Sequence, residues 1–95
     1  MSKQREARFK VKVKKQLETL PNSWWLVTNP LFAAGTPDLI GCYQGEFYAI
    51  ELKVDNNDAT TIQKHVLAKI AEAGGCTYVV NEKGFELLFK ELQLV

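Results

Sequence analysis

The fold is decided by residues 35–53, which read GTPDLIGCYQGEFYAIELK. Two runs rich in apolar, β-branched and aromatic residues, Asp38–Tyr43 and Glu46–Lys53, flank the dipeptide Gln44-Gly45. A two-residue connection that contains glycine is typical of a β-hairpin. The two runs are therefore expected to pair as antiparallel strands.

Outward from this hairpin, hydrophobic periodicity predicts helices at residues 3–19, 61–73 and 84–93 and strands at residues 24–28 and 76–80. Pro30 is expected to end the first strand, and Gly74-Gly75 to stop the second helix. The order αβββαβα predicts one α/β domain, residues 1–95, in which helices pack on the faces of a mixed sheet.

Composition narrows the class of protein. The chain has 95 residues and a net charge of +1. It lacks the ~20 consecutive apolar residues of a membrane-spanning helix, and no apolar run of a signal peptide follows its first residues. Cys42 and Cys76 lie in apolar surroundings, so we expect them to be buried and reduced, as in a cytoplasmic protein. Phe32, in the loop 32–37, is expected to be exposed unless it packs on DNA or on a second subunit.

The first helix carries most of the basic charge. Its apolar stripe is expected to contain Ala7, Val11, Leu17 and Leu20, widened by Phe9 and Val13. Its basic residues, opposed by the single acid Glu6, are Lys3, Arg5, Arg8, Lys10, Lys12, Lys14 and Lys15. Such a block is either a solvated helix face or a phosphate-binding surface. The candidate nucleic-acid contacts are Lys3, Arg5, Arg8, Lys10 and Lys12.

The hairpin also gathers the residues that carry chemistry. Because alternate residues of a strand share a face, Glu51 and Lys53 point the same way. The simpler interpretation of this pair is an ion pair on a solvated face. Asp38 begins the partner strand directly after Gly-Thr-Pro, which would place it at the same end of the sheet, although an aspartate there can also be a turn cap.

Two carboxylates beside a lysine form a chemically sensible catalytic set. Mg²⁺ binds oxygen ligands and needs few of them from the protein. Asp38, Glu51 and the backbone carbonyl of Leu52 would supply them, and Mn²⁺ is expected to substitute. The metal would activate water and neutralise phosphate charge, while Lys53 would orient the attacking water and stabilise the developing charge.

The order Gly35-Thr36-Pro37-Asp38, then Ile50-Glu51-Leu52-Lys53, then Gln63 resembles the VRR-NUC domain family of the PD-(D/E)xK nuclease superfamily. The resemblance extends from Glu6 to about Val80. It implies a restriction-endonuclease-like fold and a Mg²⁺-dependent endodeoxyribonuclease.

The resemblance also assigns second-rank site residues. The family's first-helix acid matches Glu6, which would contact the metal or its water shell, and the alternative is an ion pair with Lys10 at i+4. The family's glutamine matches Gln63, which would contact the site or the DNA backbone, and the alternative is a polar surface residue.

Stand-alone members of the family resemble Holliday junction resolvases. This implies a homodimer of phage or bacterial type that cuts four-way junctions in DNA repair, recombination or replication, because a symmetric protein matches a symmetric substrate. Two alternatives stay open: a non-catalytic DNA-binding module, and a nuclease subunit that acts on flaps or only with a partner.

Overall fold

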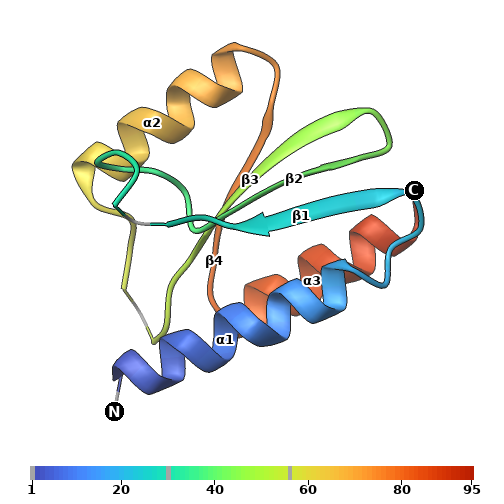
Figure 1. Cartoon of the computed structure of the whole chain (residues 1–95), viewed down its shortest axis with the longest axis horizontal. Helices are drawn as coiled ribbons and strands as arrows, with labels where there is room; N and C mark the ends of the chain where they lie inside the picture. The colour runs from blue at the N-terminus through green and yellow to red at the C-terminus, as the bar shows by residue number, and fades with distance from the viewer. Residues whose placement is uncertain (1, 30, 56) are drawn as a thin grey trace.

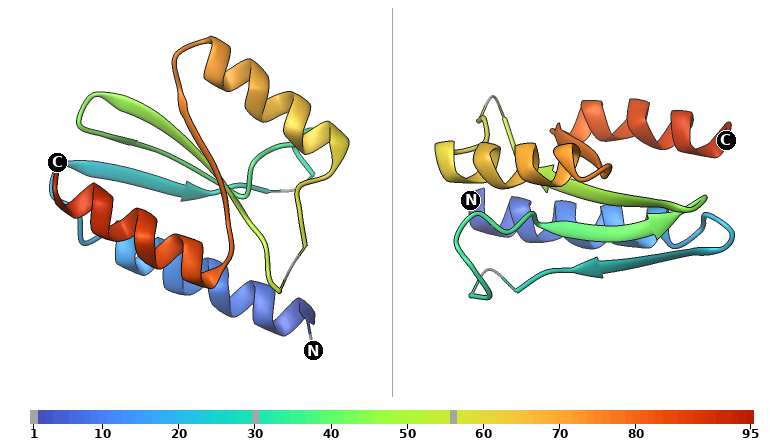
Figure 2. Two further views of the ribbon diagram at one scale, coloured as in Figure 1. Left: turned by 180° about the vertical axis from the view of Figure 1, so that it is seen from behind. Right: turned by 90° about the horizontal axis from the view of Figure 1, so that it is seen from above.

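The computed structural model describes residues 2–29, 31–55 and 57–95 and has three layers, with one helix on one face of a sheet and two on the other (Figures 1 and 2). The elements are α1 (Ser2–Leu17), β1 (Ser23–Val27), β2 (Leu39–Tyr43), β3 (Glu46–Leu52), α2 (Thr61–Glu72), β4 (Cys76–Val80) and α3 (Glu82–Gln93). The predicted α/β order is confirmed. Pro30, expected to end the first strand, lies outside the described residues.

The sheet is mixed, as predicted. Its strand order is β1-β2-β3-β4, with β3 and β4 parallel and the other neighbours antiparallel. Gln44 and Gly45 both have positive φ, 54° and 77°, which suits the tight turn between β2 and β3. The register pairs Leu39 with Ile50, so the residue before β2, Asp38, lies beside Glu51.

One face of the sheet packs on α1 and α3 and forms the main core. From β3 it receives Tyr48, Ile50 and Leu52, which lie in one buried cluster with apolar residues of both helices. The helix residues at the centre of this cluster are Phe9, Val13, Leu17, Phe85, Leu88 and Leu92. Because alternate residues of a strand face opposite sides, Ala49 and Glu51 lie on the other face of the sheet, on which α2 packs.

The predicted stripe of α1 is wrong in its N-terminal half. Phe9 and Val13 are buried, whereas Ala7 and Val11 are exposed, Val11 by 55%. Residues 7 and 9 lie about 200° apart around a helix, so only one of the two sets can face the sheet. The larger Phe9 side chain fills the core, where it makes an edge-to-face contact with Phe85.

On the face that carries α2, the part formed by β1 and β2 is left uncovered, because α2 packs against β4 at the opposite edge of the sheet (Figures 1 and 2). Trp24 and Phe47 are 58% and 43% exposed on this face. Cys42 lies between them in the register and is exposed too, so its predicted burial is wrong, and Cys76 is half-buried. In the described part of the chain, no helix is long and apolar enough to cross a membrane.

Candidate active site

Asp38 is held at the entrance of β2 by Thr28, which follows β1. The Thr28 backbone N–H donates to the Asp38 carbonyl at 3.0 Å, and the buried Thr28 hydroxyl donates to the Pro37 carbonyl. These bonds close the loop between β1 and β2 at its base and fix where the Asp38 side chain starts. Sequence reasoning missed Thr28, since a threonine at the end of a strand is usually attributed to β propensity alone.

The Asp38 and Glu51 carboxylates each accept a hydrogen bond from the backbone of the neighbouring strand segment. The Glu51 carboxylate accepts a hydrogen bond from the Asp38 backbone N–H at 3.3 Å. The Asp38 carboxylate accepts one from the Leu52 backbone N–H at 2.8 Å. Each carboxylate is thus positioned by a backbone group that β-pairing holds in place, which gives the pair a fixed separation before any ligand arrives.

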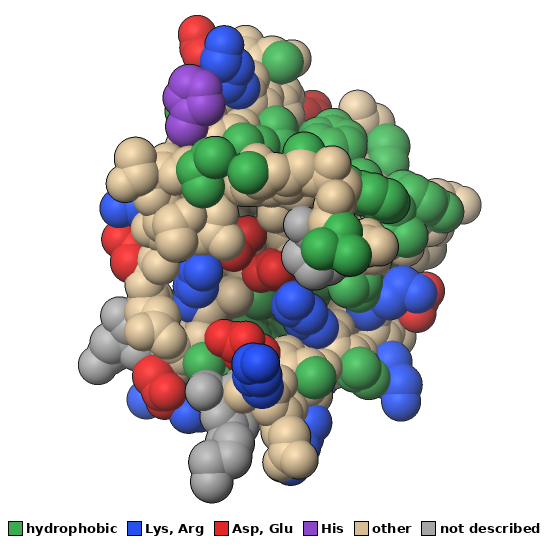
Figure 3. All heavy atoms as spheres, turned by 60° about the vertical axis from the view of Figure 1, so that its left-hand side comes forward, with side chains coloured by type: hydrophobic (Ala, Val, Ile, Leu, Met, Phe, Trp, Pro, Cys, Tyr) green, Lys and Arg blue, Asp and Glu red, His purple; other side chains and the backbone are tan. Residues whose placement is uncertain are grey.

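Each carboxylate also has its own lysine. Lys53 Nζ lies 3.3 Å from Glu51 Oε2, as strand alternation suggested, and Lys10 Nζ of α1 lies 3.3 Å from Asp38 Oδ1. Lys10 had been predicted as a nucleic-acid contact or as the ion-pair partner of Glu6, and its contact with Asp38 was not foreseen. Figure 3 shows acidic and basic side chains gathered around a hollow on this side of the molecule.

Glu51 is the most strongly perturbed acid of the cluster. Its side chain is 2% exposed. Burial, and then repulsion from the Asp38 carboxylate, raise the pKa of Glu51 from 4.5 to about 7, while Lys53 opposes the shift. A buried carboxylate next to a second one is an unfavourable arrangement for folding alone, and such arrangements concentrate at functional sites.

The donor set fits a cation that takes few protein ligands. In the described ranges, no group of three or more His, Cys, Asp or Glu side chains is placed to hold a metal. Two adjacent carboxylates suit Mg²⁺, which keeps several waters, better than they suit a site made wholly of protein ligands. Leu52, whose carbonyl was predicted as a further ligand, ends β3 directly between Glu51 and Lys53.

The two residues assigned by resemblance lie on helices, Glu6 on α1 and Gln63 on α2. Glu6 is exposed on α1, one helical turn before Lys10 and on the same side of the helix. Its alternative role, an ion pair with Lys10, is not found, since Lys10 contacts Asp38 instead. The Gln63 side chain accepts from the Thr60 N–H at 2.8 Å in a capping box that starts α2. Gln63 makes no hydrogen bond to Asp38, Glu51 or Lys53 in the described residues.

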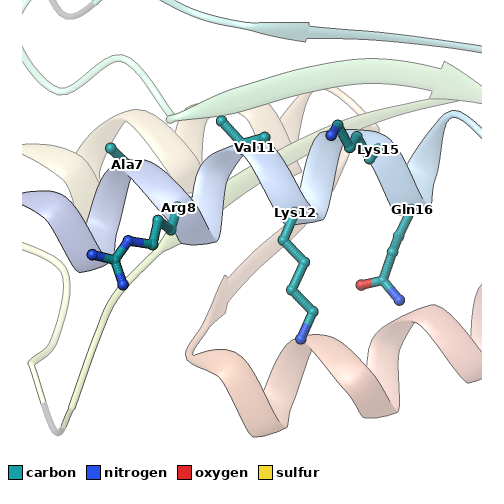
Figure 4. Close-up of a pocket in the computed structure, with 6 residues that line it drawn as sticks. All are labelled: Ala7, Arg8, Val11, Lys12, Lys15 and Gln16. Atoms are coloured by element: carbon teal, nitrogen blue, oxygen red, sulfur yellow. The ribbon is translucent and has the colours of Figure 1, made fainter.

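The basic residues of α1 fall into two groups. Arg5 is paired with Asp55 and with Glu82, Lys10 with Asp38, and Lys14 with Glu18. Arg8 and Lys12 project from one side of the helix beside a shallow pocket that Val11 also lines (Figure 4). Neither has an ion-pair partner among the described residues, so both are available to an anionic ligand.

Comparison with known proteins gives a match at the level of structure. No protein-family model matches the sequence, and no curated protein matches it significantly. A solved structure described as "VRR_NUC domain" superposes with a TM-score of 0.69 at 21% sequence identity, over 94% of this chain and 90% of that chain. The restriction-endonuclease-like architecture that the sequence resemblance implied is therefore confirmed, and the chain has the fold of a VRR_NUC domain.

Proposed function

We propose that the protein is a Mg²⁺-dependent endodeoxyribonuclease of the PD-(D/E)xK type, with Asp38, Glu51 and Lys53 as its catalytic residues. The observation that carries the proposal is the pair of carboxylates fixed on neighbouring strand ends, with an ammonium 3.3 Å from each. The fold shared with a VRR_NUC domain supports the same conclusion. DNA is the polyanion to which Arg8 and Lys12 of α1, unpaired among the described residues, are suited.

We propose the following role for each residue of the cluster. Asp38 and Glu51, with the Leu52 carbonyl, would hold Mg²⁺ or Mn²⁺, which supplies Lewis-acid chemistry to water and phosphate when bound. Lys53, held beside Glu51, would orient the attacking water and stabilise charge on the phosphate. Lys10 would leave Asp38 when a divalent cation competes for the carboxylate.

Three further groups of residues complete the proposed site. Glu6 would reach the water shell of the metal from α1. The amide nitrogen of Gln63, which the capping bond leaves free, would contact DNA. The residues proposed to contact the DNA phosphates are Lys3, Arg8 and Lys12. Arg5 is left out because its guanidinium already has two acidic partners.

The proposed substrate is a four-way junction, cut by a homodimer in the cytoplasm of a bacterium or phage host. The support for a dimer is the uncovered sheet face, where Trp24, Cys42 and Phe47 form one row across three strands and Leu26 begins the next. An exposed apolar surface of this kind is typical of an interface between subunits. A two-fold dimer would present two active sites to two strands.

The proposal is tested with purified protein and three labelled DNAs: a four-way junction, a flap and a linear duplex, each with Mg²⁺, Mn²⁺ or EDTA. We expect metal-dependent cleavage of the junction, abolished by Asp38→Asn. The matched control is Glu86→Gln, which removes an exposed carboxylate of α3, on the face of the sheet opposite the cluster. Gel filtration with light scattering measures the mass of the wild type and of Trp24→Ser.

The outcomes separate the parts of the proposal. If the wild type cuts none of these DNAs with either metal, it is not an autonomous nuclease, and a binding module or a partner-dependent subunit is the better description. Cleavage of flaps but not junctions contradicts only junction resolution. A wild-type mass of one chain contradicts only the dimer.

A further inference from the structure

Two large apolar side chains are displayed on the loop that precedes Asp38. Leu31 is 88% exposed and Phe32 is 70% exposed. When a ligand covers apolar side chains of this size, their surface is removed from water, and this burial stabilises the complex. Neither contributes to the core, so their apolar character has no explanation in the packing of the chain.

The backbone around them is held by local hydrogen bonds. The Asn29 side chain accepts from the Leu31 N–H at 2.9 Å, and the Asn29 carbonyl accepts from the Phe32 N–H at 3.0 Å. Further along, the Thr36 hydroxyl donates to the Ala33 carbonyl at 2.7 Å. A loop that is already ordered loses less entropy when its side chains bind a partner.

The loop also lies at the edge of the candidate active site. Thr28 ties its base to the backbone of Pro37 and Asp38, and Gly35 packs so closely on the start of α2 that an added Cβ would lie 2.8 Å from the Ile62 carbonyl oxygen. In Figure 3, apolar side chains border the hollow that holds the acidic and basic side chains. A strand whose phosphate reaches Asp38 would therefore meet the base of this loop.

We propose that Leu31 and Phe32 form an apolar wedge that unstacks the bases beside the cleaved phosphate. The inference rests on the proposed nuclease function and names the feature that the enzyme would select: DNA whose bases unstack easily, as they do at a branch point. Apolar side chains inserted between base steps kink a duplex, and an aromatic ring offers a displaced base a stacking surface. A second copy of the chain seated on this loop would close the hollow that DNA has to enter, so DNA is the occupant that the position favours.

The test compares Leu31→Ala and Phe32→Ala with Leu87→Ala, which truncates a 65% exposed leucine of α3 on the other side of the sheet. Each variant cuts two DNAs that differ only in the base pairs next to the cleaved phosphate, which are matched in one and mismatched in the other. Since stacking on an aromatic side chain changes affinity by roughly 5- to 150-fold per base, we expect Phe32→Ala to lower kcat/KM on the matched DNA within that range. The mismatched DNA should restore most of this loss, because its bases are already unstacked, and Leu87→Ala should behave as wild type on both.

Several results would overturn the wedge while leaving the nuclease intact. They are unchanged cleavage by Phe32→Ala, an equal loss on matched and mismatched DNA, and a Phe32→Ala protein whose mass by light scattering differs from that of the wild type. The last result would assign the loop to a subunit interface. A wild-type protein that cuts neither DNA would instead contradict the proposed function itself, and the two failures are thus distinguishable.

Discussion

Replacing Glu51 by glutamine should stabilise the protein in a pH-dependent way. The pKa of Glu51 is raised from 4.5 to about 7 by burial and by Asp38. A raised carboxyl pKa means that stability is fully present below pH 4.5 and is lost as the pH rises to about 7, because the folded state then holds an unfavourable charge. At 1.36 kcal/mol per pKa unit, the loss amounts to about 3 kcal/mol at pH 8. Glutamine has a similar shape and no charge, so Glu51→Gln should recover most of it.

The assay is thermal unfolding in EDTA at pH 4.5 and at pH 8. For a domain of this size, about 3 kcal/mol corresponds to a rise in Tm of roughly 10 to 20 °C at pH 8. At pH 4.5 the two proteins should unfold at nearly the same temperature. Glu86→Gln, which replaces an exposed glutamate of α3, is the matched control and should shift Tm at neither pH. A Glu51→Gln protein that is no more stable than wild type at pH 8, or equally stabilised at both pH values, would refute the reasoning.

Three further substitutions test the role of Lys10, the packing between β1 and β2, and the ion pairs of Arg5. Lys10→Met removes the ammonium that competes for Asp38, so Mg²⁺ should bind more tightly by titration calorimetry. Equal or weaker metal affinity would show that Lys10 does not compete. Gly41→Ala would place a Cβ 2.1 Å from the ring of Trp25, and overpacking of this kind should lower the free energy of unfolding in urea by about 1–3 kcal/mol or more. An unchanged midpoint would mean that β1 can shift to make room. Arg5→Ala breaks two exposed ion pairs and should leave Tm within error of the wild-type value, because such pairs are screened by solvent.

The parts of the fold that could be predicted are those encoded by local rules. The pairing of β2 with β3 follows from Gln44-Gly45 and from period-2 alternation, and both act over a few residues. The same alternation placed Glu51 and Lys53 on one face, where the structure finds them 3.3 Å apart. The position of Asp38 followed once the hairpin was assumed.

The parts that could not be predicted depend on how separate elements pack. Apolar residues at positions 7, 9, 11 and 13 lie on both sides of α1, so periodicity alone could not choose its rotation. The rotation of α1 is set by its packing against the sheet, which buries Phe9 and Val13. The same rotation brings Lys10 to Asp38, a contact for which the sequence carries no separate signal. The exposure of Cys42 likewise depends on which strands α2 leaves uncovered.

The charges of the cluster suggest why metal and DNA should bind together. Asp38 and Glu51 face Lys10 and Lys53, so when both acids are ionised the four side chains sum to zero. A cluster with no net charge attracts a phosphate only weakly. A bound divalent cation would make the local charge positive even after Lys10 has left Asp38, which attracts phosphate and also reduces the repulsion between the two carboxylates. By thermodynamic linkage, DNA should then raise the affinity for the metal by the same factor as the metal raises the affinity for DNA.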